Sequence, residues 1–174
     1  MTVPLTVTLG DPDGLLLRPW TAQDAQALLA VAGDPELRAR LLTLKVADRA
    51  DADRWLQAQR HGWEQGVRFS FAVLTGDRLA GQVVLKRPDP ASDTGEVGYW
   101  TAAAARGQGV ASRAAELLTD WALSAHALRR LELYHAVDNS ASCRVAQKAG
   151  YPLEAELPPQ PRWPDPGHLH VRER

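Results

Sequence analysis

In the first third of the chain, one short apolar run is followed by apolar residues spaced three and four apart, as on one face of an α-helix. Thr21 and Asp24 have the spacing of a capping box at the start of the first helical segment. The pair Asp34-Pro35 supplies an N-cap residue and a first-turn proline for the second. The pattern predicts a strand at 15–20 and helices at 21–32, from 34 onward and at 50–63.

From residue 69 onward, shorter apolar runs separated by turn residues indicate that strands become more frequent. We expect a hairpin formed by 69–74 and 79–85, and then strands at 96–101, 131–137, 151–156 and, in a short and polar form, 168–173. Helices are expected from Gly109 and at 139–149, where Gly150 ends the second. This mixed order predicts an α/β fold with a central sheet that is part parallel and part antiparallel.

Composition and charge narrow the class of protein. The 174 residues, 45% apolar and 24% charged, suit a single globular domain over residues 1–174. A net charge of −1 predicts no bulk attraction to nucleic acid or to an anionic membrane. The sequence shows neither an apolar run of membrane-spanning length nor a signal peptide, and its single cysteine, Cys143, suits a reducing compartment. We therefore expect a cytoplasmic protein.

The segment between the strand at 96–101 and the following helix carries the strongest chemical signal. Gly107 and Gly109 leave backbone N–H groups uncovered, and the helix N-terminus adds a partial positive charge. Together with Arg106 they predict a site for a pyrophosphate, with a glycine-bearing turn that binds nothing as the alternative. Two nucleotide-binding motifs do not fit this segment. The dinucleotide fingerprint needs a third glycine where this chain has Ser112, and the Walker A sequence is absent.

The pattern Arg-x-x-Gly-x-Ala at 106–111 resembles the acetyl-CoA signature of the GNAT superfamily of N-acetyltransferases. The segments 16–24, 95–100 and 138–151 resemble further parts of the same family, in the order of its RimJ/RimL-like branch of ribosomal-protein N-terminal acetyltransferases. The resemblance covers about residues 14–157. It implies a single-domain α/β fold in which helices flank a mixed central sheet with splayed fourth and fifth strands. It also implies an enzyme, an acyltransferase that uses acetyl-CoA and no metal.

The resemblance assigns cofactor contacts to two stretches of main chain and one side chain. The main chain of Tyr99, Trp100 and Thr101 is implied to bind the pantetheine arm, while core packing is the favoured role of the two aromatic side chains. Asn139 is implied to hydrogen-bond the same arm, and its alternative role is that of a helix N-cap. The implied pyrophosphate cradle consists of Arg106, Gly107, Gln108, Gly109, Val110, Ala111 and Ser112.

Two residues are candidates for the chemistry, which transfers acetyl directly to a primary amine without a covalent enzyme intermediate. Glu96 is the candidate base, acting directly or through a water, unless it is a solvent-facing strand residue. Ser142 is the candidate acid for the leaving thiolate, with simple helix packing as the alternative. Many relatives carry a tyrosine acid four residues later, where this chain has Ala146, so Tyr134 and Tyr151 are the substitutes.

The acceptor is open among three alternatives: a protein N-terminal α-amine, a small amine such as an amino acid, polyamine or antibiotic, and no acceptor at all in a non-catalytic CoA-binding module. Trp55, His61 and Trp63 are expected to line an acceptor groove together with Arg162, Trp163 and Asp165 of the proline-rich segment Pro158–Pro166, unless these are surface residues. A dimer contact is the alternative role of that segment, so a homodimer also stays open.

Cys143 and the five histidines are the remaining candidates for special chemistry. Because no motif fixes a histidine near Cys143, we expect a buried, inert thiol rather than a nucleophile. His168 and His170 share one face of a strand, but no acidic third ligand accompanies them. The sequence therefore predicts no metal site.

Overall fold

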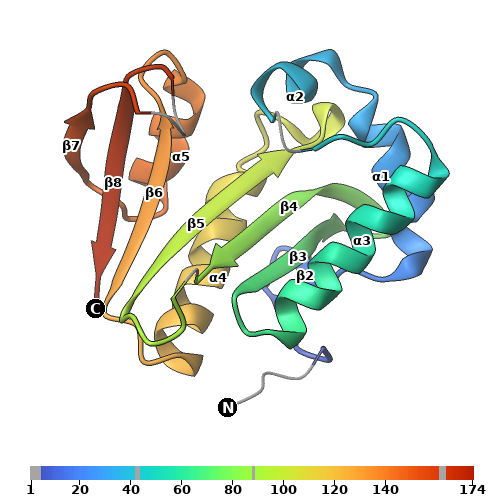
Figure 1. The fold of residues 1–174 in the computed structure, drawn as a ribbon, viewed down its shortest axis with the longest axis horizontal. Coiled ribbons are helices and arrows are strands. Elements are labelled where there is room, and N and C mark those ends of the chain that lie inside the picture. Colours follow the sequence, from blue (N-terminus) through green and yellow to red (C-terminus); the bar gives the residue numbers. More distant parts are fainter. Residues whose placement is uncertain (1–4, 42–43, 88, 161–163) are drawn as a thin grey trace.

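One mixed sheet of eight strands organises the chain (Figure 1). The computed structural model describes residues 5–41, 44–87, 89–160 and 164–174. The strand order is β1-β2-β3-β4-β5-β6-β8-β7, and among these described strands only β5 and β6 run parallel. The strands are β1 (Leu9–Gly10), β2 (Leu15–Pro19), β3 (Arg68–Thr75), β4 (Arg78–Lys86), β5 (Thr94–Thr101), β6 (Arg130–Ala136), β7 (Leu153–Leu157) and β8 (Gly167–Glu173).

Helices cover both faces of this sheet. Helix α4 packs on β4 and β5, while α1 and α3 pack against each other and α3 covers β3 (Figure 1). Two buried apolar clusters result, because neighbouring residues of a strand point to opposite faces. Among the described helices, none has the length and apolar character that a membrane span needs. The helices are α1 (Ala25–Ala32), α2 (Pro35–Arg40), α3 (Arg49–Glu64), α4 (Val110–Ala125) and α5 (Ser140–Lys148), with short 3₁₀ turns η1 (Ala22–Asp24) and η2 (Ala103–Ala105).

The predicted α/β architecture and the predicted order of helices and strands are confirmed. The backbone N–H of Thr21 donates to the Asp24 carboxylate at 2.7 Å, as the capping-box spacing indicates. The two-residue strand β1 was not predicted, because two residues are too few to show a period. The expected weakness of the last strand is wrong: β8 pairs with β6 on one side and with β7 on the other, burying Leu169 and Val171.

Strands β5 and β6 are joined along only part of their length. Their parallel pairing joins Thr94–Val97 of β5 to Arg130–Leu133 of β6. Beyond that point, among the described strands, residues 98–101 pair with β4 alone and residues 134–136 pair with β8 alone. Figure 1 shows the two strands separating from their shared lower end. The predicted splay is therefore present, and the main chain of β5 lines its edge.

Candidate active site

The turn before α4 has the backbone that the sequence indicated for an anion site. Gly107 and Gly109 have φ angles of 76° and 74°, a region that L side chains rarely adopt, and Gly109 is the N-cap residue of α4. A Cβ built on either glycine would meet no atom of the described residues within 4 Å. Open space therefore lies over the turn, next to the unpaired N–H groups that begin an α-helix.

The side chains around this turn are engaged within the protein. Val110, the first residue of α4, is buried in the core between this helix and the sheet. The hydroxyl of Ser112 donates to the carbonyl of Gly109 at 3.0 Å, and the amide of Gln108 donates to the carbonyl of Ala104 at 2.7 Å. What this turn offers to a ligand is its main chain, with the small Ala111 leaving the second helical position uncrowded.

Arg106 crosses to the start of α2 and does not stand alone over the turn. Its guanidinium forms an ion pair with Asp34, the N-cap residue of α2, and a second with Glu36 at 2.7 Å. These carboxylates tie α2 to the turn, about 70 residues away along the chain. The sequence suggested Arg106 as a phosphate donor, and in this structure two carboxylates occupy that guanidinium.

Tyr99 and Trp100 on β5 point to opposite faces of the sheet, and both side chains are packed. The hydroxyl of Tyr99 donates to the carbonyl of Ser142 at 3.3 Å, and burial raises the pKa of Tyr99 to about 12. Trp100 is 7% exposed and lies against Trp20, with ring centroids 6.2 Å apart. The core-packing alternative therefore holds for both aromatic side chains. Thr101 ends β5 opposite Gly81, so the main chain of 98–101 is what borders the opening.

Helix α5 begins beside this opening. The side chain of Asn139 accepts a hydrogen bond from the backbone N–H of Ser142 at 3.1 Å, so Asn139 is the N-cap residue of α5. The cap fixes Ser142 in the first turn of the helix, and the hydrogen bond from Tyr99 links that turn to β5 across the splay. The structure thus brings Ser142 and Asn139 to the same edge as the β5 main chain.

Glu96 lies on the other face of the sheet, in a row of charged residues. It pairs with Lys86 on β4 in an ion pair, and its register partner on β6 is Glu132, which accepts from Arg130 at 2.7 Å. The Glu96 side chain is only 16% exposed, so the alternative of a solvent-facing strand residue is wrong. A shielded carboxylate next to the splay can accept a proton or a hydrogen bond from an amine.

The two tyrosines named as substitute acids are engaged elsewhere. Tyr151 is fully buried, shares a hydrogen bond with Thr119 on α4, and has its pKa raised to about 12 by burial. The hydroxyl of Tyr134 donates to Glu132, and burial together with this carboxylate raises the pKa of Tyr134 well above its ordinary value. Ser142 therefore stays the better candidate.

One of the residues expected to line an acceptor groove lies in the core instead. Trp63 is 2% exposed and lies edge-on to Phe69 in the core, with ring centroids 5.2 Å apart. Trp55 is partly buried and packs edge-on against Trp20, and His61 is exposed. Trp63 is therefore a core residue, contrary to the expectation. Of the residues named in the proline-rich segment, Asp165 is exposed, and Arg162 and Trp163 lie outside the described residues.

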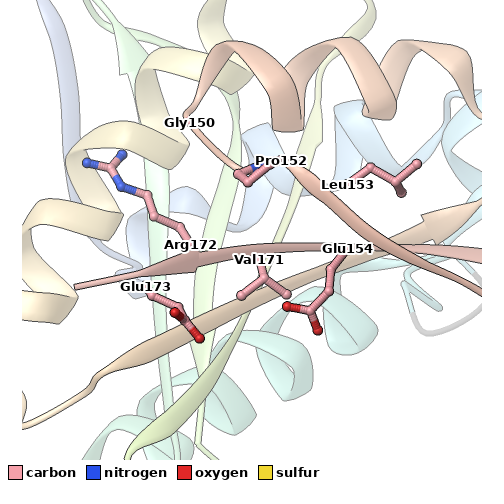
Figure 2. Close-up of a pocket in the computed structure, with 7 residues that line it drawn as sticks. All are labelled: Gly150, Pro152, Leu153, Glu154, Val171, Arg172 and Glu173. Carbon is pink, nitrogen blue, oxygen red and sulfur yellow. The ribbon is translucent and has the colours of Figure 1, made fainter.

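A surface hollow lies apart from these residues, along the outer hairpin of β7 and β8 (Figure 2). Arg172 extends toward α4, where it lies 3.5 Å from Asp120, whereas the carboxylates of Glu154 and Glu173 extend to the opposite side (Figure 2). Arg130 lies within ion-pair distance of both carboxylates. This hollow contains none of the predicted site residues, and we assign no site to it. Its lining residues are Gly150, Pro152, Leu153, Glu154, Val171, Arg172 and Glu173.

One group of residues that the sequence analysis kept apart is brought together by the fold. Cys143 of α5 lies with His135, His168 and His170, and their ligating atoms are all within 4.8 Å of one another. Cys143 was expected to be buried, and it is only partly buried; three histidines, which no sequence motif had placed there, lie beside its thiol. The signal that could have found this group is the pairing of β6 with β8, which places His135 opposite His168.

Comparisons with known proteins agree with this geometry. The family model described as an acetyltransferase (GNAT) domain matches residues 14–152. The ribosomal-protein-serine acetyltransferase of Escherichia coli (strain K12) is 30% identical over 112 residues, which are 64% of this chain and 63% of that protein. The chain thus aligns with somewhat less than two thirds of this curated relative.

Solved structures of low sequence identity share the fold. The microcin C7 self-immunity acetyltransferase MccE, in complex with acetyl-CoA and AMP, matches with a TM-score of 0.88 and 17% identity over 99% of this chain and 98% of that one. RimL, a ribosomal L7/L12 alpha-N-protein acetyltransferase in complex with coenzyme A, matches with a TM-score of 0.86 and 19% identity over 96% and 98%. RimJ of Mycobacterium smegmatis matches with a TM-score of 0.81 and 21% identity over 96% and 86%.

Proposed function

Because this chain belongs to the GNAT acetyltransferase domain family, we propose that it is an N-acetyltransferase that moves the acetyl group of acetyl-CoA to a primary amine. The observation that carries the proposal is the opening between β5 and β6 beside the glycine turn of α4. The opening offers unpaired strand main chain, and the turn offers a helix N-terminus under open space. These are the two features that a long cofactor with amide groups and a pyrophosphate requires.

The described residues fit acetyl-CoA in specific roles. The backbone N–H groups of 107–112 would hold the pyrophosphate, because the positive end of α4 favours negative charge there. The main chain of 98–101 would bind the amides of the pantetheine arm in place of a neighbouring strand. When bound, acetyl-CoA supplies a thioester whose acetyl group can be attacked by an amine, and the transfer needs no metal.

Two side chains would move the protons of the reaction. Glu96 would accept a proton from the acceptor amine, directly or through a water, from its shielded position on β5. Ser142 would donate a proton to the leaving thiolate from the first turn of α5. Ser142 lies beside the unpaired part of β5, and Glu96 lies two residues before that part begins, so the amine and the thiolate would exchange protons with different elements of the fold.

We propose a protein N-terminal α-amine as the acceptor. The name of the E. coli relative supports this choice, because that protein is called a ribosomal-protein-serine acetyltransferase. A small-molecule amine is the alternative acceptor, because MccE is named as a microcin C7 self-immunity acetyltransferase. A cytoplasmic location follows as part of the proposal, since the single cysteine suits a reducing compartment. A homodimer is a separate question for solution measurements.

An amine panel tests the acceptor. Purified protein would be incubated with acetyl-CoA and with peptides that begin in serine or alanine, the same peptides blocked at the N-terminus, amino acids, polyamines and aminoglycosides. Released thiol and product mass would be measured. We expect turnover with the free peptides and none with the blocked ones. Turnover with small amines alone would overturn the peptide acceptor, and acetyl-CoA binding without turnover of any amine would identify a binding module.

Replacing Ser142 with alanine should lower kcat by about 10²- to 10⁴-fold, the usual contribution of a general acid. Helix α5 should persist, because its cap uses the backbone N–H of Ser142 and the side chain of Asn139. The matched control is Ser140→Ala, two residues earlier on the same helix and exposed. Steady-state kinetics and acetyl-CoA titration check the result. Equal rates in the two variants would remove Ser142 as the acid.

A further inference from the structure

Three histidines and the single cysteine converge between α5 and the strands β6 and β8. His135 comes from β6, His168 and His170 come from β8, and Cys143 comes from α5. The antiparallel register pairs His135 with His168 and Leu133 with His170, so the three imidazoles share one face of the sheet. Their ring centroids lie between 5.0 and 6.1 Å apart. The nearest ligating atoms of all four residues lie within 4.8 Å of one another.

One ring nitrogen of each histidine, called here the outward nitrogen, faces an oxygen outside the cluster. His135 Nδ1 lies 2.8 Å from the carbonyl of Ala136, and His170 Nδ1 lies 2.9 Å from the carbonyl of Tyr151. His168 Nε2 lies 3.7 Å from the carboxylate of Glu156. Because a carbonyl oxygen can only accept, Nδ1 of His135 and Nδ1 of His170 carry the hydrogen, and the Nε2 atoms of these two rings present lone pairs toward the cluster.

The inward nitrogens are buried without a partner. His135 Nε2, His168 Nδ1 and His170 Nε2 have no hydrogen-bond partner within the described part of the chain. His170 is fully buried and His135 is 7% exposed. Cys143 can offer one S–H, which serves one of these three nitrogens at most. Buried polar atoms left unpaired destabilise a fold, so this arrangement calls for a cation at its centre.

We propose that Cys143, His135, His168 and His170 bind one zinc ion. Zinc takes four nitrogen and sulfur ligands in a tetrahedron, at about 2.0–2.1 Å for nitrogen and about 2.3 Å for sulfur. Such a tetrahedron separates its ligand atoms by about 3.3–3.6 Å, so a set already within 4.8 Å needs only a small closure. A thiolate with three imidazoles disfavours magnesium and calcium, which prefer oxygen ligands.

The surroundings of the cluster match those of a metal site. Backbone carbonyls and a carboxylate hold the outer nitrogens of ligating histidines in the way seen here. The side-chain amide of Gln147 donates to the Cys143 sulfur at 3.6 Å, an interaction that suits a thiolate. On binding, zinc replaces the thiol proton of Cys143, which passes to solvent. With four protein ligands the site is closed, so its role is structural.

The site would fasten α5 to the strands beside the cofactor opening. Cys143 follows Ser142 in sequence, and His135 lies on the part of β6, beyond Leu133, that no longer pairs with β5. The zinc site therefore links the helix that carries the candidate acid to the C-terminal hairpin. This inference stands on the four side chains alone and does not rest on acetyl transfer.

Metal content is the direct test. The full chain without an affinity tag would be purified under reducing conditions without chelator. Its zinc content would be measured by inductively coupled plasma mass spectrometry. We expect about one zinc per chain, and a fall in the melting temperature when a chelator removes it. Cobalt added to the chelated protein should give a thiolate charge-transfer band and the strong visible bands of tetrahedral coordination. Failure to take up stoichiometric zinc, together with a weak octahedral cobalt spectrum, would overturn the proposal.

Two variants and a control sharpen the test. Cys143→Ser should remove the charge-transfer band and weaken zinc binding by more than about tenfold, and His170→Gln should also lose zinc. The control His61→Gln removes an exposed histidine of α3 and should retain one zinc. Circular dichroism would establish that each variant is folded. Unchanged zinc affinity and spectrum in Cys143→Ser would overturn the ligand set. None of these readouts uses acetylation, so failure here leaves the proposed function untouched.

Discussion

Replacing Gly109 with valine should weaken acetyl-CoA binding by at least about 100-fold, which is about 2.7 kcal/mol. The backbone at Gly109 has a φ of 74°, and open space lies where a Cβ would stand. In the proposed complex that space brings the pyrophosphate against the N–H groups that begin α4. A branched side chain would fill it and hold the phosphates away from donors worth about 1.5–3 kcal/mol each to a charged group.

Titration calorimetry with acetyl-CoA measures this effect, and Gly66→Val is the matched control. Gly66 has a φ of 69° and equally open surroundings, but it follows α3, in another part of the fold. Both variants therefore carry the same kind of backbone strain, about 1–2 kcal/mol, and should lose similar thermal stability. Only Gly109→Val should lose acetyl-CoA. Wild-type affinity in Gly109→Val would place the pyrophosphate elsewhere, and equal loss in both variants would make strain the cause.

Replacing Glu96 with glutamine should lower kcat by about 10²- to 10⁴-fold and change the KM for acetyl-CoA by no more than about twofold. Glutamine keeps the shape of the side chain and can still accept a hydrogen bond from Lys86, so the strand should be undisturbed. What it loses is the ability to take a proton from the acceptor amine. Steady-state kinetics with the best amine of the panel would measure the change.

The control for this variant is Glu132→Gln. Glu132 is the register partner of Glu96 on β6, and its carboxylate is occupied by Arg130 and by the hydroxyl of Tyr134. We expect its kcat within about threefold of wild type. Wild-type turnover in Glu96→Gln would exclude Glu96 as the base. An equal loss in both variants would indicate that the negative charge of this row, rather than one proton acceptor, supports the reaction.

Features that depend on a few neighbouring residues could be predicted from the sequence. The N-caps Asp34 and Asn139 are confirmed, because a cap involves residues two or three positions apart. The glycine turn before α4 could also be predicted from the sequence, since a strand, two glycines and a periodic helix follow one another closely. The order of helices and strands and the mixed character of the sheet come from the same local periods.

Charge partners across the sheet were decided by the tertiary structure. The guanidinium of Arg106 is the kind of group that binds phosphate, but its carboxylate partners on α2 are far from it in sequence. Glu96 is shielded and paired because β4 places Lys86 beside it. Trp63 is a core residue because Phe69 and Trp121 pack around it. Periodicity tells which side of a strand or helix a residue faces, and it does not tell what lies opposite.

The sequence by itself determined the elements of this protein and the glycine turn at which an anion would bind. Only the tertiary structure decided where β5 and β6 part: beyond Val97 and Leu133 each strand stays paired on its other edge, β5 with β4 and β6 with β8, while the two no longer pair with each other. The same register gathers His135, His168 and His170 around Cys143. These residues lie in three separate elements, so no spacing along the chain encodes their meeting, and the pairing of strands and the packing of α5 create it.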